Sequence, residues 1–422
     1  MTQRYDTYKN SGVQWLGEIP GHWGCIPFRR LASVKSNLVH PVDYMDYPQI
    51  APDSIEKNSG RILHWKTVAD SNVESDNHLF FKGQILYSKI RPLLNKVTIA
   101  PFDGLCSADM YPIETMQNTK FLLYYMLSNA FLESVTNATR DRVKMPKINR
   151  EELGSIDICV PPLSEQRAIV TYLDDKCGKI DKLVEGKQKQ IELLAEMKQR
   201  IIADAVTRGL NPNVKMKATN IPWLPEIPEH WETHRAKHMF NKEQRPFEEG
   251  DEIVTCFRDG EVTLRKNRRT TGFTEATDYS HYQHICKGDL VIHQMDAFAG
   301  SAGVSDSDGM GTPVLSVCTP KSENILNEYY AHIVRLMGKN GFILSLYRGI
   351  RERSSDFRFD TFAKLWLPVP PLPEQRAIVT YLDDKCSKID LLVEKLKAEI
   401  EAIKEYKQRL ISDVVTGQIK VC

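Results

Sequence analysis

The sequence predicts an α+β protein built as a pseudo-two-fold tandem repeat, in which two globular domains are separated by two long antiparallel coiled-coil helices. The first observation is a repeated stretch: PPLSEQRAIVTYLDDKC at 161–177 returns as PPLPEQRAIVTYLDDKC at 370–386. The second is that apolar residues follow each copy at alternating steps of four and three. The third is that each copy is preceded by a region of short strand-like and helical runs.

The repeat covers the whole chain and sets its organisation. Up to Asp181 and Asp390, 19 of 21 aligned positions are identical at an offset of 209 residues, and WLGEIPGHW (15–23) matches WLPEIPEHW (223–231) upstream. Two units of this length indicate a duplicated module and not a solenoid, whose repeats are shorter and more numerous. The predicted parts are an N-terminal arm (1–23), head 1 (24–160), a first long helix (161–208), a linker with the second arm (209–231), head 2 (232–369) and a second long helix (370–417).

Each long helix carries an apolar seam with the 3.5-residue spacing of a coiled coil. Lys187, Lys198 and Lys407 interrupt the series. A single helix with this seam would expose a long apolar stripe, so we expect the two seams to pack against each other. The alternative is that each helix packs separately on its own head. The predicted seam consists of Leu173, Cys177, Ile180, Val184, Ile191, Leu194, Ile201 and Ala205 in the first helix, and of Leu382, Cys386, Ile389, Val393, Leu396, Ile400, Ile403, Leu410 and Val414 in the second.

The ends of both helices are marked in the sequence. Ser164 and Pro373 suit a helix start, and a glutamate follows each of them in the first turn. Gly209 and Gly417 stand where a C-terminal cap is expected. About 42 residues at 1.5 Å each give a rod of roughly 60 Å, the length of a spacer.

The two heads have different sequences but the same predicted order of elements. A strand-like run follows a Lys-Gly turn in each, GQILYSKI (83–90) and GDLVIHQM (288–295). A helical pattern comes later, at 119–135 and 327–343, and a final apolar stretch leads into the long helix. Residues 207–222, rich in Asn, Pro and Gly, are predicted to be a connector between the modules.

Basic residues cluster twice in each head, and we expect the clusters to occupy equivalent places. Cations of this kind neutralise phosphates, and arginine also reads guanine in the major groove. For any single residue, a solvated charged surface is the simpler interpretation. The predicted DNA-binding residues are Lys89, Arg91, Lys96, Arg140, Arg142 and Lys144 in head 1, and Arg258, Arg265, Lys266, Arg268, Arg269, Arg351 and Arg353 in head 2.

Composition limits the class of protein. The formal net charge of +1 excludes a polycation that would coat nucleic acid through its overall charge. The start, MTQRYDTYKNSG, predicts no secretory signal, and no apolar run is long enough for a membrane span, so a cytoplasmic location is expected. Nine scattered cysteines without C-x-x-C indicate reduced thiols. Two histidine pairs, His234 with His238 and His281 with His284, have no third ligand placed by sequence, and no metal site is predicted.

With its doubled P-P-L-x-E-Q-R element, each copy opening a long helix after a divergent domain, the chain resembles the specificity subunit of type I restriction–modification enzymes. The resemblance covers essentially the whole chain. It implies two target recognition domains, each reading one half of a bipartite DNA site, and helices that fix the unread gap. It also implies two methyltransferase subunits that modify adenine N6 and two motor-nuclease subunits as partners.

The chain itself is predicted to be non-catalytic. It contains no N-P-P-F or D-P-P-Y element, no G-x-x-x-x-G-K-[ST] phosphate loop and no recognisable nuclease carboxylate cluster. The resemblance therefore places S-adenosylmethionine, ATP and Mg²⁺ on partner subunits, with no cofactor in this chain. Two alternatives are a fused or degenerate restriction nuclease with its own activity and a coiled-coil adaptor without a DNA role.

Overall fold

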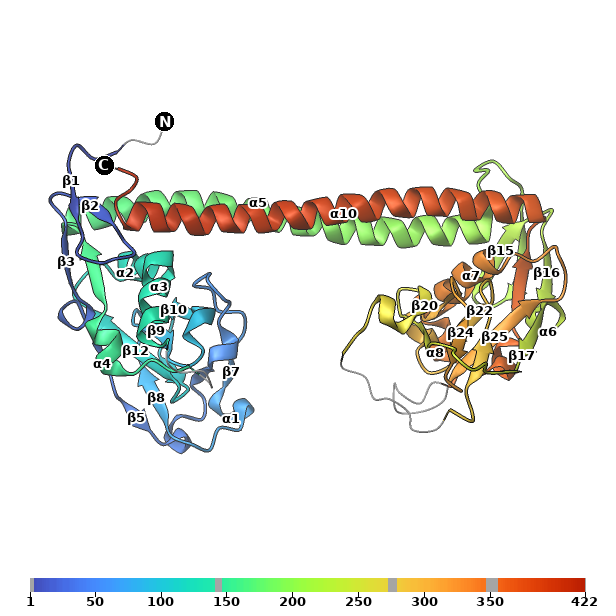
Figure 1. Ribbon diagram of the computed structural model, residues 1–422, viewed down its shortest axis with the longest axis horizontal. Coiled ribbons are helices and arrows are strands. Elements are labelled where there is room, and N and C mark those ends of the chain that lie inside the picture. Colours follow the sequence, from blue (N-terminus) through green and yellow to red (C-terminus); the bar gives the residue numbers. More distant parts are fainter. Residues whose placement is uncertain (1–3, 141–145, 272–278, 347–355, 422) are drawn as a thin grey trace. The chain divides into compact units, whose positions relative to one another are not determined.

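The protein consists of two compact units. In this computed structural model, residues 4–140, 146–271, 279–346 and 356–421 are described. Unit 1 comprises residues 1–189 and 396–422, and unit 2 comprises residues 190–395. Each unit therefore contains one head, the start of one long helix and the end of the other (Figure 1).

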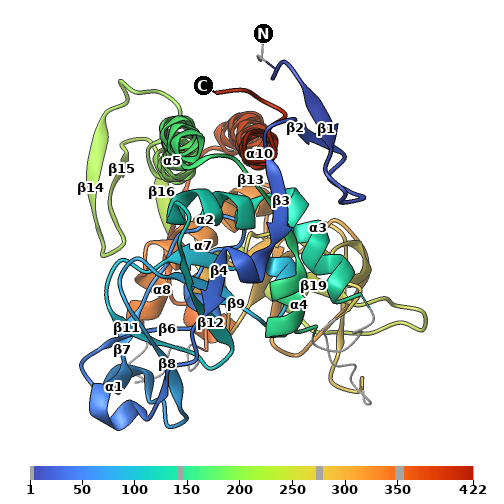
Figure 2. The same ribbon diagram turned by 90° about the vertical axis from the view of Figure 1, so that its left-hand side faces the viewer.

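The long helices are α5 (Leu163–Arg208) and α10 (Leu372–Val415), with 46 and 44 residues, or about 69 and 66 Å at 1.5 Å per residue. They run antiparallel. In unit 1, Asp181 pairs with Lys407 at 2.7 Å and Lys187 with Glu399 at 2.5 Å, so positions rise along one helix as they fall along the other. Figure 2 shows unit 1 from its end, with α5 and α10 side by side.

Every residue of the predicted seam is buried or half-buried in the structure, which agrees with two helices packed on each other. Each of the three lysines that interrupt the seam reaches a carboxylate on the opposite helix. Lys198 pairs with Asp390 at 2.7 Å in unit 2, and Lys407 makes the same pair with Asp181 in unit 1. At an offset of 209 residues these two ion pairs are equivalent, so the repeat extends to the polar contacts between the helices.

Both helices end on glycines with left-handed backbone, Gly209 at φ +75° and Gly417 at φ +76°. A Cβ on Gly417 would lie 2.3 Å from Pro20 Cδ and 3.3 Å from Trp23, and one on Gly209 would lie 3.4 Å from Trp231. The expected caps are therefore also places of close approach. The helix starts lie one residue before the predicted Ser164 and Pro373, at Leu163 and Leu372.

The glutamate of each P-P-L-x-E-Q-R element binds the repeated His-Trp pair. Glu165, which is 8% exposed, accepts hydrogen bonds from Trp23 Nε1 at 3.2 Å and Tyr5, and lies 2.9 Å from His22 Nε2. In unit 2, Glu374 accepts from Trp231 Nε1 at 3.0 Å and lies 2.9 Å from His230 Nε2. The two repeated motifs, distant in sequence, are thus one structural contact.

The neighbouring glutamine fastens a helix of the head to the long helix. Gln166 is fully buried; its Oε1 accepts from Asn118 N at 3.0 Å and its Nε2 donates to Pro161 O at 2.9 Å. Gln375 repeats this with Leu326 N at 3.0 Å and Pro370 O at 2.8 Å. Asn118 and Leu326 are the N-caps of α2 (Thr119–Leu127) and α7 (Asn327–Lys339). The side-chain amide therefore satisfies a backbone N–H at a helix start, where no intrahelical partner exists.

Both heads contain a four-stranded antiparallel sheet with the same strand order, β10-β9-β12-β4 in head 1 and β23-β22-β25-β17 in head 2. The two runs that follow the Lys-Gly turns are the inner strands β9 and β22. The strands are β4 (Ala32–Val34), β9 (Ile85–Ser88), β10 (Val97–Ile99) and β12 (Met110–Thr115), and β17 (Phe240–Glu243), β22 (Leu290–His293), β23 (Ala302–Val304) and β25 (Leu315–Pro320).

A second layer of strands differs between the heads. Head 1 has a five-stranded sheet, β5-β8-β11-β6-β7, whereas head 2 has a three-stranded sheet, β18-β21-β24, and a separate pair, β19-β20. Their bounds are β5 (Leu38–Val39), β6 (Pro48–Ile50), β7 (Lys66–Thr67), β8 (Asn77–Phe80) and β11 (Gly104–Cys106), and β18 (Arg245–Pro246), β19 (Val254–Cys256), β20 (Val262–Leu264), β21 (Gln283–Ile285) and β24 (Gly309–Gly311).

The predicted helical stretch of each head is broken in two. Ser128 caps both α2 and α3, and Gly341 at φ +81° separates α7 from α8. The remaining short helices are α1 (Val68–Ser71), α3 (Asn129–Ala138), α4 (Arg150–Ser155), α6 (Ala236–Met239), α8 (Phe342–Ser345) and α9 (Phe359–Phe362), with single 3-10 turns at η1 (Phe28–Arg30), η2 (Pro41–Tyr44), η3 (Pro52–Ser54), η4 (Pro92–Leu94), η5 (Arg265–Asn267) and η6 (Ala297–Ala299).

Two-stranded ribbons connect the heads to the helices. The segment 207–222, predicted as a connector between the modules, contains the strand β14. This strand pairs with β15, as β1 pairs with β2 in the N-terminal arm. The pairs are β1 (Tyr8–Asn10) with β2 (Glu18–Pro20), β3 (Gly24–Pro27) with β13 (Asp157–Val160), β14 (Met216–Ile221) with β15 (Leu224–Pro228), and β16 (Glu232–Arg235) with β26 (Trp366–Val369).

The expectation of reduced thiols was wrong for one pair. Cys25 and Cys159 are directly opposite each other on β3 and β13, and they form a disulfide. At the same register in head 2, Thr233 is opposite Pro368, so this bond has no counterpart there. Cross-strand neighbours are close enough for such a bond, but a scattered sequence pattern does not reveal them.

His332 on α7 is half-buried in unit 2. No described residue forms a hydrogen bond with its Nδ1. Burial, together with the neighbouring cations Arg335 and Lys198, lowers the pKa of His332 to about 4. The imidazole is therefore neutral in the folded protein over a pH range in which it is protonated in the unfolded chain.

We expect unit 2 to lose stability as the pH falls below about 6.5, the ordinary pKa of histidine. Between this pH and about pH 4, His332 binds a proton in the unfolded chain but not in the folded one. Between pH 7.5 and 5 the free energy of unfolding should fall by about 2 kcal/mol from this residue. Denaturant unfolding of the His332→Gln variant should lack this component. The exposed His238→Gln on α6 is the control, and an unchanged pH dependence in His332→Gln would contradict the assignment.

Candidate nucleic-acid interface

The two basic segments of head 1 meet in space although some 50 residues separate them in the sequence. Arg91 N donates to Pro146 O at 2.9 Å, and Ile148 N donates to Lys89 O at 2.9 Å, so Ile90 and Lys147 form an antiparallel bridge. Lys89 N also donates to Asp109 O at 3.0 Å. We call this arrangement frame 1. In it residue 89, which directly follows β9, forms backbone hydrogen bonds with residues 109 and 148.

Frame 1 carries an excess of positive charge. Lys89 and Lys147 share one carboxylate, Asp109, at 3.9 and 3.5 Å. The ring of Tyr111 lies 5.3 Å from Lys89 Nζ and 5.8 Å from the guanidinium carbon of Arg150. Burial lowers the pKa of Lys89, and the nearby charges of Lys147 and Arg150 contribute to the lowering. An anion such as a phosphate would relieve this repulsion, which makes frame 1 a candidate phosphate or base contact.

Head 2 repeats the backbone of this arrangement with other side chains. Gln294 N donates to Val314 O at 2.9 Å, and Phe357 N donates to Gln294 O at 2.9 Å. We call this arrangement of residues 294, 314 and 357 frame 2. Ile148 and Phe357, the residues that close the two frames, are both fully buried. The shared strand order aligns position 89 with 294. Even a side-chain contact is shared, because Lys89 Nζ donates to Ala108 O and Gln294 Nε2 to Pro313 O, at 3.3 Å in frame 2.

The side chains around the frames differ in charge and shape. The strand alignment places Ser316 at the position of Tyr111, and the offset of 209 residues places Asp356 and Phe359 at those of Lys147 and Arg150. These described positions of frame 2 therefore carry no cation. Gln294 also donates to Ser316 Oγ at 3.3 Å. Lysine is suited to phosphates and guanine, whereas glutamine forms paired hydrogen bonds with adenine.

The basic cluster predicted in head 2 does not lie at the place of the one in head 1. Residues 258–269 run from the turn after β19 through β20 and η5, before β22, whereas residues 89–96 follow β9, so the expectation of equivalent places was wrong for these clusters. Several of the cations are also ion-paired locally. The pairs are Arg258 with Asp296 at 2.8 Å, Arg268 with Asp259 at 2.7 Å, and Lys266 with Glu252.

The remaining predicted residues fall into three groups. Lys96 Nζ donates to Pro52 O at 2.6 Å and so holds two loops of head 1 together. Arg91 and Arg140 are exposed in head 1. In head 2, Arg269 is exposed and its Nε donates to Thr271 O at 3.3 Å, and Arg265 is half-buried on η5. Arg142, Lys144, Arg351 and Arg353 lie outside the described residues.

Sequence reasoning missed several residues in and around the frames. Arg150 and Tyr111 stand outside the basic runs, and Gln294 and Ser316 carry no charge. Aligning the two heads at their Lys-Gly turns would have placed Gln294 opposite Lys89. Nothing in the sequence alone brings Asp109 to that position, because the contact depends on the pairing of β9 with β12.

Comparison with known families decides what kind of protein carries these heads. The model of the type I restriction modification DNA specificity domain matches twice, at residues 33–193 and 228–402. The chain belongs to this family. It is a type I specificity subunit, the DNA-recognition subunit and not a catalytic one, as the sequence predicts.

Individual relatives agree with this assignment. The specificity subunit of the Escherichia coli type I restriction enzyme EcoDI is 40% identical over 201 residues, which cover 47% of this chain and 45% of that protein. That match therefore spans less than half of the relative. The putative MjaX specificity subunit of Methanocaldococcus jannaschii is 22% identical over 427 residues, covering 96% of both chains.

Solved structures share the fold. A chain from a structure describing complex assembly and conformational transition of the type I R-M system superposes with a TM-score of 0.69 at 15% identity, covering 95% of this chain and 99% of the other. The HsdS subunit of Thermoanaerobacter tengcongensis gives a TM-score of 0.50 at 17% identity over 95% and 98% of the two chains. Among the described residues, no helix combines the length and apolar character needed to cross a bilayer.

Replacing Lys89 by Gln, the residue of frame 2, should weaken DNA binding while preserving a donor for Ala108 O. If Lys89 contacts a phosphate, affinity falls for all sequences and the slope of log K against log salt decreases by about 1. If it contacts a base, one position loses roughly 1–3 kcal/mol of discrimination. Fluorescence anisotropy over a salt series separates the two. Lys35→Gln, at an ion pair with Glu114 in the same head, is the control; equal behaviour of both variants would remove Lys89 from the interface.

Proposed function

We propose that this subunit recognises a bipartite double-stranded DNA site, each head reading one half, and that α5 and α10 fix the length of the unread gap. It would thereby direct adenine methylation and cleavage by partner subunits. The observation that carries the proposal is the contrast between the two frames: their backbone hydrogen bonds match, but Lys89, Asp109 and Tyr111 in one correspond to Gln294, Val314 and Ser316 in the other. Identical readers would specify identical half-sites; these specify different ones.

The repeated helix starts support two equal docking sites for partners. The glutamate and glutamine of each element are explained by contacts inside the unit. Arg167, Thr171 and Asp175, at steps of four on one face of α5, are exposed, and so are their counterparts Arg376, Thr380 and Asp384 on α10. Packing does not require these exposed residues to be identical. Two copies of one partner, the methyltransferase subunit, would require it.

The proposal assigns the chemistry to those partners. Two methyltransferase subunits would supply S-adenosylmethionine-dependent transfer to adenine N6, and two motor-nuclease subunits would use ATP and Mg²⁺ to cleave unmethylated DNA. The chain would bring no cofactor to the reaction. A fused or degenerate nuclease is the alternative function, and cleavage or methylation of DNA by the purified chain alone would favour it over a purely directing role.

Charge reversal at the repeated arginines tests the docking sites. Co-expressed with its methyltransferase subunit, Arg167→Glu or Arg376→Glu should each reduce the complex from two methyltransferase copies to one, and the double variant to none, as measured by light scattering of the purified complex. The control is Lys189→Glu, an exposed lysine of α5 whose counterpart is Ala398. A double variant that still binds two copies would contradict docking at these faces.

A seven-residue insertion tests the spacing role. Added after Lys187 and after Leu396, it keeps the seam in register and lengthens each helix by about 10 Å, or roughly three base pairs. Single-molecule sequencing of methyladenine should show a two-part motif for the wild-type complex. The variant should show the same half-sites with a longer gap, or no methylation, because the second half-site also rotates by about a third of a turn.

Full activity of the insertion variant on the original gap would show that the helices do not set it. An insertion of seven residues in a loop of one head, outside the helices, is the control for the general effect of added chain. A motif without two separated parts in the wild-type complex would contradict the proposed function itself.

A further inference from the structure

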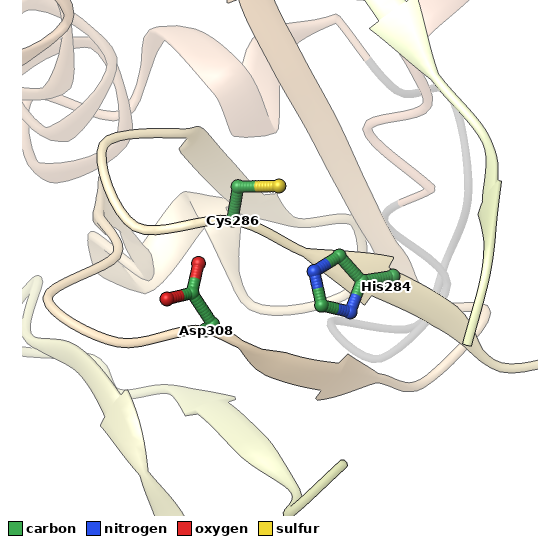
Figure 3. Close-up of side chains that lie close together, drawn as sticks. All are labelled: His284, Cys286 and Asp308. Carbon is green, nitrogen blue, oxygen red and sulfur yellow. The ribbon is translucent and has the colours of Figure 1, made fainter. Parts of the chain in front are cut away.

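Head 2 brings together three side chains with metal-binding atoms. Among the described residues, His284, Cys286 and Asp308 form one group in which the imidazole nitrogen, thiol sulfur and carboxylate oxygen all lie within 4.8 Å of one another. Figure 3 shows the three side chains facing one another, two from one segment of the chain and the third from a neighbouring loop. His284 and Cys286 stand at the end of β21, and Asp308 precedes β24. These strands are paired, with Ile285 opposite Gly309, so the sheet itself positions the three residues.

His284 is oriented by a second carboxylate. Its Nδ1 lies 2.8 Å from Asp251 Oδ2, and the side chains of His284 and Asp251 are only 11% and 10% exposed. When Nδ1–H donates to this carboxylate, the lone pair of Nε2 remains available and faces Cys286 and Asp308 (Figure 3). A carboxylate behind a histidine is the arrangement that fixes the tautomer of metal-binding imidazoles.

Comparison with the equivalent turn in head 1 shows which of these residues the turn itself requires. Asp308 Oδ1 accepts a hydrogen bond from Lys287 N at 2.9 Å, and Asp103 Oδ1 accepts from Lys82 N at 2.7 Å in head 1. The turn therefore explains the aspartate in both heads. It does not explain His284 and Cys286, whose positions in head 1 are occupied by Leu79 and Phe81. One oxygen of Asp308 is left for another contact.

We propose that His284, Cys286 and Asp308 bind one divalent transition-metal ion of the zinc class, with Asp251 as the positioning residue for His284. Imidazole nitrogen, thiolate sulfur and carboxylate oxygen are the zinc ligands of proteins, and three protein ligands leave a fourth tetrahedral position for water. The ion would join the turn after β21 to the turn before β24, and so fix the second layer of head 2. Magnesium or calcium would not select a thiolate.

The charges around the group suit a divalent ion. A thiolate and a carboxylate together balance the two positive charges of the metal. Burial raises the pKa of the Cys286 thiol, while Arg245 acts in the opposite direction. Arg245 is held by Asp289 at 2.5 Å, and the same carboxylate accepts from Cys286 N at 2.8 Å.

Titration of the full-length protein with Co²⁺ tests the site, because a thiolate ligand gives a charge-transfer band in the near ultraviolet. We expect one equivalent per chain with this band, displaced by Zn²⁺. Cys286→Ser should abolish the band, whereas Cys256→Ser, which removes another thiol of head 2, should leave it. Asp251→Asn should weaken Zn²⁺ binding roughly 10–100-fold without removing a ligand.

A matched pair of variants distinguishes the metal from the turn. Asp308→Asn and Asp103→Asn both keep an acceptor for the turn, but only Asp308→Asn should weaken Co²⁺ binding and the protection of the protein by Zn²⁺ against thermal unfolding. Absence of the band in the wild-type protein, or its persistence in Cys286→Ser, would overturn the proposal. Equal binding by Asp308→Asn and Asp103→Asn would remove Asp308 from the site. None of these results depends on DNA or partner subunits.

Discussion

Each arm and head are fixed to the start of a long helix by two adjacent side chains, a buried or half-buried glutamate and a fully buried glutamine, and the rest of each unit depends on this attachment. Glu165 contacts Tyr5, His22 and Trp23, and Gln166 accepts from the N–H of Asn118, the N-cap of α2. A buried polar group is costly unless it is paired, so each member of this contact requires the others. This explains why both halves of the chain repeat the residue pairs Glu-Gln and His-Trp.

The second constraint is the register of the paired helices. A lysine in an apolar seam is unfavourable unless a carboxylate on the opposite helix compensates it. Lys407 with Asp181 and Lys198 with Asp390 meet this condition at equivalent places in the two units. A shift of one heptad would keep the apolar contacts but separate these charges. The polar interruptions therefore restrict the helices to one alignment, which a purely apolar seam would not.

The sequence could predict most of this architecture, because the signals are local and repeated. The seam, the glycine caps and the strands after each Lys-Gly turn follow from spacing and turn chemistry within a few residues. The breaks at Ser128 and Gly341 also have local signals, a serine N-cap and a left-handed glycine. The disulfide between Cys25 and Cys159 and frame 1 could not be predicted in the same way. Each depends on which strand or helix lies beside another, and composition does not contain that information. Counting basic residues misplaced the cluster of head 2 for the same reason.

The frames show how one fold can present different recognition surfaces. Residues 89 and 294 each follow a buried strand and are held by backbone bonds that do not depend on their side chains. Ile148 and Phe357 close the frames from the core, so the apolar anchor is retained, while Lys147 and Arg150 at the outer side of frame 1 correspond to Asp356 and Phe359 in frame 2. Substitutions on the outer side of such a frame alter charge and hydrogen-bonding groups but leave the packing intact, and such surface changes usually cost less than about 0.5 kcal/mol. Chemical specificity can therefore change without a change in the attachment of the head to its helix, which is the part that the repeat preserves.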